Sequence, residues 1–146
     1  DVVILDRLQD PANVGAVLRT VAAAGLGRVV TTPGTSACWS PKGLRAGMGG
    51  QFALQIHEGI ELATLLPRLD VPLAATVVHE GRSIDQVDLR PALAWWFGNE
   101  GEGIVESGDI RARVRLRIDQ SPAVESLNVA AAAAICLFEQ RRQRRA

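Results

Sequence analysis

The sequence lacks the features that mark several common classes of protein. Its 16 basic and 16 acidic residues cancel, so no overall electrostatic field drives the chain onto nucleic acid. No apolar run is long enough to span a bilayer, and no stretch has the pattern of a signal peptide. The two cysteines, Cys38 and Cys136, form no C-x-x-C pair. We therefore expect free thiols in a reducing compartment, the cytoplasm.

The chain also lacks the residues that nucleotide hydrolysis or a metal centre would need. Lys42 is its only lysine, and it does not follow the glycine pattern of a phosphate-binding loop. His57 and His79 each stand alone and fit surface or core positions better than ligand positions. A nucleotide hydrolase is therefore disfavoured, and we expect no metal site.

Short apolar runs alternate with segments of helical periodicity along the whole chain. The expected strands are 2–6, 28–32, 52–56, 72–78, 92–98 and 111–118, and the expected helices are 11–24, 40–50, 60–69 and 125–145. Strands that alternate with helices predict an α/β fold with a mainly parallel sheet flanked by helices. Without a linker or an internal repeat, residues 1–146 are expected to form one domain.

The segment "GNEGEG" (98–103) directly follows the apolar run "ALAWWF". Ligands of open α/β sheets bind at the carboxyl ends of the strands. Two carboxylates, Glu100 and Glu102, would repel a phosphate but suit hydroxyl donors or a cation. Taken alone, the segment is better explained as a tight turn with solvated acids.

Two further segments combine polar side chains with helix starts. In "DPANVGAVLRT", Asn13 and Arg19 lie near the beginning of the first expected helix, where an anion would be favoured. In "ESLNVAAAAA", Ser126 and Asn128 precede a run of small residues that would let a second backbone approach closely. Simple helix capping by Asn13, Ser126 and Asn128 and a solvated Arg19 would also explain them.

The three segments contain the patterns N-x-G-A-x-x-R-T, G-N-E-G-x-G and S-L-N-V. In this order they resemble the three motifs of the SpoU branch of the SPOUT methyltransferases, and the resemblance covers nearly the whole chain. It implies a deep trefoil knot in the C-terminal part, a homodimer, and transfer of a methyl group from S-adenosylmethionine to a ribose 2′-hydroxyl of rRNA or tRNA, with rRNA favoured. A non-catalytic RNA-binding homologue of the same fold is the alternative.

The resemblance also implies roles for individual residues. Those expected to act on the RNA nucleotide are Asn13, Arg19, Glu100, Ser126 and Asn128. Those expected to bind the cofactor are Thr76, Gly98, Glu100, Ile118 and Leu127. Because arginine is effectively always protonated, Arg19 suits a phosphate anchor better than a base.

The chain differs from the family pattern in the loop before the serine motif. We also expect a further domain outside this sequence. Where relatives often have I-P-M-x-G before the serine motif, this chain has Asp119, Gln120 and Pro122, so affinity for the cofactor is in question. The chain begins at Asp1 rather than Met, and we expect it to be the catalytic part of a longer protein with an N-terminal RNA-binding domain.

Arginine alternates with apolar residues in "RARVRLRI". Strand periodicity places Arg111, Arg113, Arg115 and Arg117 on one face. We expect an edge or partly uncovered strand, with an RNA track or an ion-pair surface across a dimer as the functional alternatives.

Overall fold

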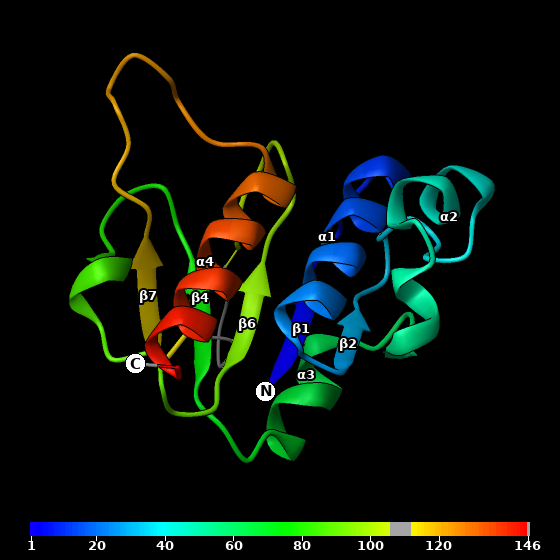
Figure 1. Cartoon of the computed structure of the whole chain (residues 1–146), viewed down its shortest axis with the longest axis horizontal. Coiled ribbons are helices and arrows are strands. Elements are labelled where there is room, and N and C mark those ends of the chain that lie inside the picture. The colour runs from blue at the N-terminus through cyan, green and yellow to red at the C-terminus, as the bar shows by residue number, and fades with distance from the viewer. Residues whose placement is uncertain (106–111, 146) are drawn as a thin grey trace.

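The computed structural model describes residues 1–105 and 112–145, which fold as alternating strands and helices (Figure 1). The strands are β1 (Val2–Leu5), β2 (Arg28–Thr31), β3 (Gln55–His57), β4 (Leu73–Thr76), β5 (Arg82–Ser83), β6 (Ala94–Phe97) and β7 (Val114–Arg117). The α-helices are α1 (Pro11–Ala24), α2 (Pro41–Gly47), α3 (Leu62–Leu65) and α4 (Val129–Gln143). Short 3-10 turns are η1 (Gly50–Ala53), η2 (Leu66–Arg68) and η3 (Ile84–Gln86).

The strands form one sheet in the order β3-β2-β1-β6-β4-β7-β5. Every described pairing in it is parallel, which confirms the predicted α/β class. Parallel strands bring their carboxyl ends to one edge, and β1, β6, β4 and β7 lie side by side there. This edge receives the loops that carry the predicted site residues.

Apolar side chains point alternately to the two faces of the sheet. Val3, Trp95 and Phe97 face α1 and α4, whereas Ile4 and Trp96 face the side covered by α3. This alternation follows from the two-residue period of a strand, and it makes β1 and β6 apolar throughout. The sheet is therefore buried between two layers, with α1, α2 and α4 on the same side (Figure 1).

The first helix begins and ends where its sequence predicts. The Asp10 carboxylate accepts a hydrogen bond from the Ala12 N–H at 2.9 Å, and Pro11 takes the first helical position. Gly25 ends the helix with φ of 84°, a conformation that glycine adopts without strain. The cap geometry orients α1 so that Asn13 lies at the edge of the sheet that carries the strand ends.

Three strand predictions differ from the structure. The sequence predicts a strand over 52–56, but this segment begins inside η1, and β3 starts only at Gln55 because the chain turns at Gly49. The short strand β5 is not predicted from the sequence. β7 is not the edge strand, since it lies between β4 and β5, but it is partly uncovered, which is the other expectation, and Arg113 and Arg115 are exposed. Arg111 lies outside the described residues.

The C-terminal helix α4 contacts the N-terminal residue and the core strand β6. The buried Gln140 accepts a hydrogen bond from the indole of Trp95 at 2.9 Å, and Arg144 forms an ion pair with Asp1 at 2.6 Å. Arg141 donates to the Ala24 carbonyl at 2.7 Å, and Arg142 pairs with Glu139. Arg141, Arg142 and Arg144 therefore each contact another group of the fold itself.

Both cysteines are free, as expected, and both are buried. Burial disfavours the thiolate and raises the pKa of Cys38 and of Cys136 to about 12, with the Glu58 carboxylate adding to the effect at Cys38. Thiols of this kind are unreactive.

Within the described ranges, no helix is long and apolar enough to cross a membrane.

Candidate active site

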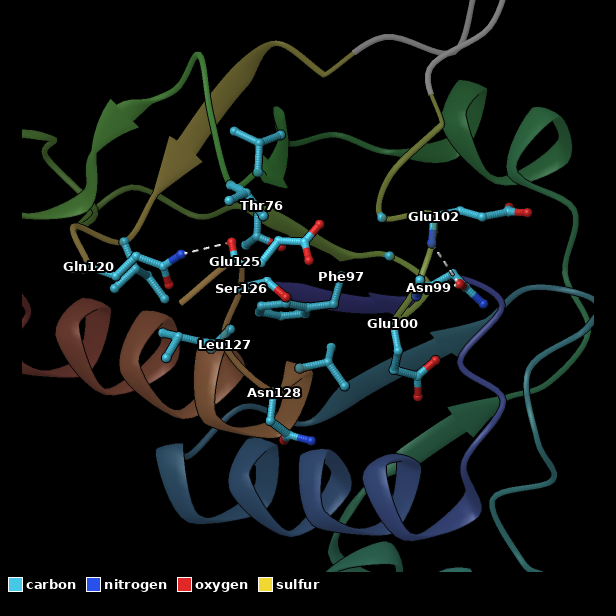
Figure 2. Close-up of a pocket in the computed structure, with 18 of the residues that line it drawn as sticks. Thr76, Phe97, Asn99, Glu100, Glu102, Gln120, Glu125, Ser126, Leu127 and Asn128 are labelled. Carbon is cyan, nitrogen blue, oxygen red and sulfur yellow. Dashed lines mark hydrogen bonds between the residues drawn. The ribbon is translucent and has the colours of Figure 1, made fainter. Parts of the chain in front are cut away.

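A pocket of about 490 Å³ opens at the carboxyl ends of β4, β6 and β7. Figure 2 shows Thr76, Ser126 and Leu127 on one side of it and Glu100 and Glu102 on the other, with Phe97 between them. The predicted site residues that line it are Asn13, Thr76, Gly98, Glu100, Ile118, Ser126, Leu127 and Asn128. Segments more than a hundred positions apart in the sequence thus meet in one cavity.

The loop after β6 is shaped by glycine and by Asn99. A side chain at Gly98 would place its Cβ 2.4 Å from the carbonyl group of Gly103, so only glycine fits there without a shift. The Asn99 side chain accepts hydrogen bonds from the N–H groups of Gly101 and Glu102 at 2.8 and 3.0 Å. Its amide also donates to the Arg7 carbonyl at 2.8 Å, which ties the loop to the end of β1. The segment is therefore a turn fixed by hydrogen bonds, and its Glu100 and Glu102 side chains are exposed, as the turn interpretation expects.

Three side chains from the three motifs form a hydrogen-bonded chain. Asn128 donates from Nδ2 to Oδ1 of Asn13 at 3.0 Å. Asn13 in turn donates from its own Nδ2 to Oε1 of Glu100 at 3.1 Å. The second carboxylate oxygen of Glu100 accepts from the Gln9 N–H at 3.3 Å, so Glu100 is held in one orientation. The amide of Asn13 is thereby the central member of the site.

Asn128 serves a second purpose, because it also caps α4. Its Oδ1 accepts hydrogen bonds from the Ala130 and Ala131 N–H groups at 2.9 and 3.4 Å. The capping interpretation is thus correct for Asn128, and it is compatible with the contact to Asn13. Ser126 lies before the cap, is exposed, and lines the pocket.

The far wall of the pocket is largely apolar. Leu116 and Phe97 are buried there, and Ile118 and Leu127 are half-buried. Thr76 also lines the pocket, and it donates its hydroxyl proton to the Trp96 carbonyl at 3.1 Å. Such a wall suits a flat, weakly polar ring system.

The charges at the pocket are acidic. Glu100, Glu102 and Glu125 line it, and no lysine or arginine is among the lining residues in the described ranges. Glu102 is partly neutralised by Arg7, whose Nη1 lies 2.7 Å from the carboxylate. A phosphate would be repelled here, whereas hydroxyl donors and a positively charged group would be favoured. Among the described residues, no cluster of histidine, cysteine or acidic side chains is arranged to hold a metal ion.

Arg19 does not line the pocket. It lies on α1 six positions beyond Asn13 and is exposed. Its backbone packs against Gly50, because a Cβ added to Gly50 would lie only 2.9 Å from the Arg19 Cα. The sequence predicts Asn13 and Arg19 on different sides of the helix, and the structure places only Asn13 at the cavity. Any role of Arg19 must therefore be exerted outside this cavity.

The residues that depart from the family pattern make specific contacts. Asp119 accepts from the Ser83 hydroxyl at 2.7 Å and pairs with Arg117. Gln120 donates to the Glu125 carbonyl at 3.2 Å across the loop (Figure 2). Pro122 lies on an exposed turn. Two of the three altered side chains, Asp119 and Gln120, therefore form hydrogen bonds that hold this loop in place.

Several participants are not foreseen from the sequence. Asn99 organises the loop, Phe97 lines the apolar wall, and Arg7 pairs with Glu102. Asn99 has a detectable signal, since asparagine in a glycine-rich segment is typical of turns in which the side chain accepts from its own backbone. No local pattern indicates the Arg7 contact, which spans 95 positions.

The sequence of the chain is similar to a known protein family and to several of its members. The sequence model of the SpoU rRNA Methylase family matches residues 2–138. The chain is 37% identical over 144 residues to the 23S rRNA (guanosine-2′-O-)-methyltransferase RlmB of Bordetella pertussis, covering 97% of this chain and 59% of that protein. It is 32% identical to the 23S rRNA (guanosine(2553)-2′-O)-methyltransferase RlmP of Bacillus subtilis, covering 96% of this chain and 57% of the relative.

A solved structure agrees with the sequence relatives. An AdoMet-bound rRNA methyltransferase from Sinorhizobium meliloti superimposes with a TM-score of 0.89 at 32% identity, covering 97% of this chain and 55% of that one. The chain thus spans little more than half the length of the curated relatives it matches. From its motifs, its parallel sheet and a match over nearly its whole length, the chain belongs to the SpoU rRNA methylase family.

Proposed function

We propose that this protein transfers a methyl group from S-adenosylmethionine to a ribose 2′-hydroxyl of RNA, with rRNA as the favoured substrate. The observation that carries this proposal is the joining of the three motifs through Asn128, Asn13 and Glu100 at the mouth of one pocket. It is supported by relatives named as 23S rRNA 2′-O-methyltransferases and by the AdoMet-bound neighbour.

The pocket fits S-adenosylmethionine by its shape and its charge. The Gly98 backbone is free of side-chain bulk and lets a ribose approach closely, and the Glu100 carboxylate can accept from its hydroxyl groups. Leu116, Ile118 and Leu127 offer an apolar wall to the adenine ring. The acidic lining is favourable for a sulfonium cation. When bound, the cofactor supplies the activated methyl group.

The side chains of the three motifs would then position the RNA nucleotide. A ribose hydroxyl is a weak nucleophile and reacts faster as it loses its proton. Asn13, Ser126 and Asn128 provide amide and hydroxyl groups at the pocket mouth that can orient this hydroxyl. Arg19, which stays protonated and lies outside the pocket, would hold a phosphate of the same RNA and so help to position the nucleotide.

Three features of the whole protein belong to the same proposal. We infer a homodimer, supported by the exposed Ile135 and Phe138 on α4 beside its small alanines, and sedimentation velocity would test it.

We also infer that the C-terminal part is tied in a trefoil knot. That inference is supported by the path of the chain. The chain leaves β7, which lies on the far side of β4 from β6, and then returns to form α4, which contacts β6 (Figure 1). An RNA substrate and two unpaired thiols support a cytoplasmic location.

Mass spectrometry of RNA nucleosides tests the reaction itself. RNA from cells with the gene should contain a 2′-O-methylated nucleoside at a stoichiometry that falls to background when the gene is deleted. Complementation with the wild-type gene should restore it, and complementation with an Asn13→Ala variant should not. A nucleoside profile that is identical with and without the gene would contradict the proposed activity.

A further inference from the structure

The region beside Arg19 exposes three large apolar side chains. Phe52 is 78% exposed, Met48 71% and Trp39 45%, although all three lie on a well-packed part of the chain. The rings of Trp39 and Phe52 contact each other with centroids 5.6 Å apart at an angle of 57°. We call Trp39, Met48 and Phe52 the aromatic surface. Large apolar side chains that are exposed together commonly mark a surface that binds a partner.

The backbone beneath the aromatic surface is held rigidly. Met48 itself adopts φ of 48°, and Gly49 follows with φ of 84°, so the chain makes a sharp turn that ends α2. Gln51 is fully buried and donates to the Gly43 carbonyl at 3.0 Å, anchoring η1 to α2. Gly50 packs against the Arg19 backbone. The aromatic surface is thus presented by a fixed scaffold next to Arg19.

The charges around the aromatic surface favour an anionic partner. Arg19 and Arg45 are both exposed, and neither forms an ion pair within the part of the chain that the structure describes. The other nearby cation, Lys42, is paired with Asp10 at 2.8 Å, and Glu58 is held by the Cys38 N–H. Exposed aromatic faces flanked by arginine are the means by which proteins bind unstacked bases of single-stranded RNA.

We propose that the aromatic surface is a base-stacking subsite, where Trp39 and Phe52 hold an unpaired base of the RNA and Arg19 and Arg45 hold its phosphates. This inference rests on the proposed function, because it concerns the RNA that the pocket would methylate. Arg19 lies six residues from Asn13, about 9 Å along α1, so a nucleotide near the methylated one can reach it. The subsite gives Arg19 a place in RNA binding that the pocket does not.

The fluorescence of Trp39 reports on this subsite directly. Trp95 and Trp96 are fully buried, so among the three tryptophans Trp39 alone is open to a quencher. A single-stranded oligouridylate should quench Trp39 emission, because a stacked base contacts the indole. An abasic ribose-phosphate oligomer of the same length should not quench it. Equal quenching by both probes would mean phosphate binding without stacking, and no quenching would mean no contact; either result would overturn the proposal.

Substitutions at Phe52 separate stacking from other apolar contacts. Phe52→Leu should weaken oligouridylate binding about ten-fold, because it removes one stacking face, whereas Phe52→Tyr should bind within about two-fold of wild type. Both variants should fold, since Phe52 is exposed. If leucine binds as well as tyrosine, the proposal is wrong. If Phe52→Leu instead abolishes self-association in sedimentation velocity, a second copy of the chain is the partner and the proposal is also wrong.

Cofactor binding distinguishes a failed subsite from a failed function. The Phe52 variants should bind S-adenosylmethionine as wild type does in calorimetry. Normal cofactor binding and normal methyl transfer in Phe52→Leu would leave the proposed function intact while rejecting the subsite. A wild-type protein that binds no cofactor would reject the function instead.

Discussion

At the scale of single residues, Gly98 and Gly101 occupy the same loop under different constraints. Gly98 faces the backbone of Gly103 at 2.4 Å from a would-be Cβ, whereas the nearest atom to a Cβ on Gly101 is Oδ1 of Asn99 at 3.5 Å. Alanine therefore fits at Gly101 but forces the loop apart at Gly98. The two positions provide a matched pair for testing whether the loop shape binds the cofactor.

We expect Gly98→Ala to weaken S-adenosylmethionine binding about ten-fold or more, the scale of an overpacked contact. Gly101→Ala should change the affinity by no more than about two-fold, because the contact it adds is ordinary. Isothermal titration calorimetry gives both values, and circular dichroism confirms that both variants fold. Equal affinities for the two variants would show that the cofactor does not depend on this loop.

The motifs identify residues that line one pocket, and the six-residue spacing on α1 places Arg19 away from that pocket. Asn13, Ser126 and Asn128 are identified from motifs, and they do line one pocket. Arg19 belongs to the same motif as Asn13, but a six-residue separation on a helix turns its side chain away. A linear motif gives order and spacing, and it does not specify which cavity each side chain faces.

At the scale of elements, the start of α4 combines a structural and a functional contact in one side chain. Asn128 accepts from two helical N–H groups through Oδ1 and donates to Asn13 through Nδ2. Serine can replace the first contact but not the second. The two contributions can therefore be measured separately.

Asn128→Ala should lower the free energy of unfolding by about 1 kcal/mol, the typical value of a helix cap, and Asn128→Ser should lower it by only a few tenths. Both variants should lower the rate of methyl transfer about five- to ten-fold, because both lose the hydrogen bond to Asn13. Urea unfolding and a methyl-transfer assay at saturating cofactor provide the two measurements. A serine variant with wild-type rate would show that Asn128 is only a cap.

Local signals determine how well each element can be predicted. α1 has a capping aspartate, a proline and a terminal glycine, and both of its ends agree with the prediction. The predicted start of β3 is too early, because residues 50–53 form η1 instead of a strand. This turn packs against α1 at Arg19, and such a contact between distant residues has no local signal. β5 is two residues long, so it has no periodicity to detect, and it exists through pairing with β7.

At the scale of the whole molecule, the parallel sheet is predictable but its strand order is not. Alternating strands and helices indicate the class, whereas placing β6 between β1 and β4 requires contacts across the sequence. The same non-local order assembles the pocket from the ends of β4, β6 and β7 and the approach to α4. The contact of Arg7 with Glu102 and that of Asn13 with Asn128 both follow from it.

Cofactor binding by the intact protein tests the central claim most directly. Isothermal titration calorimetry should show saturable binding of S-adenosylmethionine, and S-adenosylhomocysteine should compete for the same site. The acidic pocket predicts tighter binding of the sulfonium than of the neutral thioether. If neither compound binds at millimolar concentration, the pocket at the ends of β4, β6 and β7 is not a methyl-donor site, and the protein is a non-catalytic member of its family.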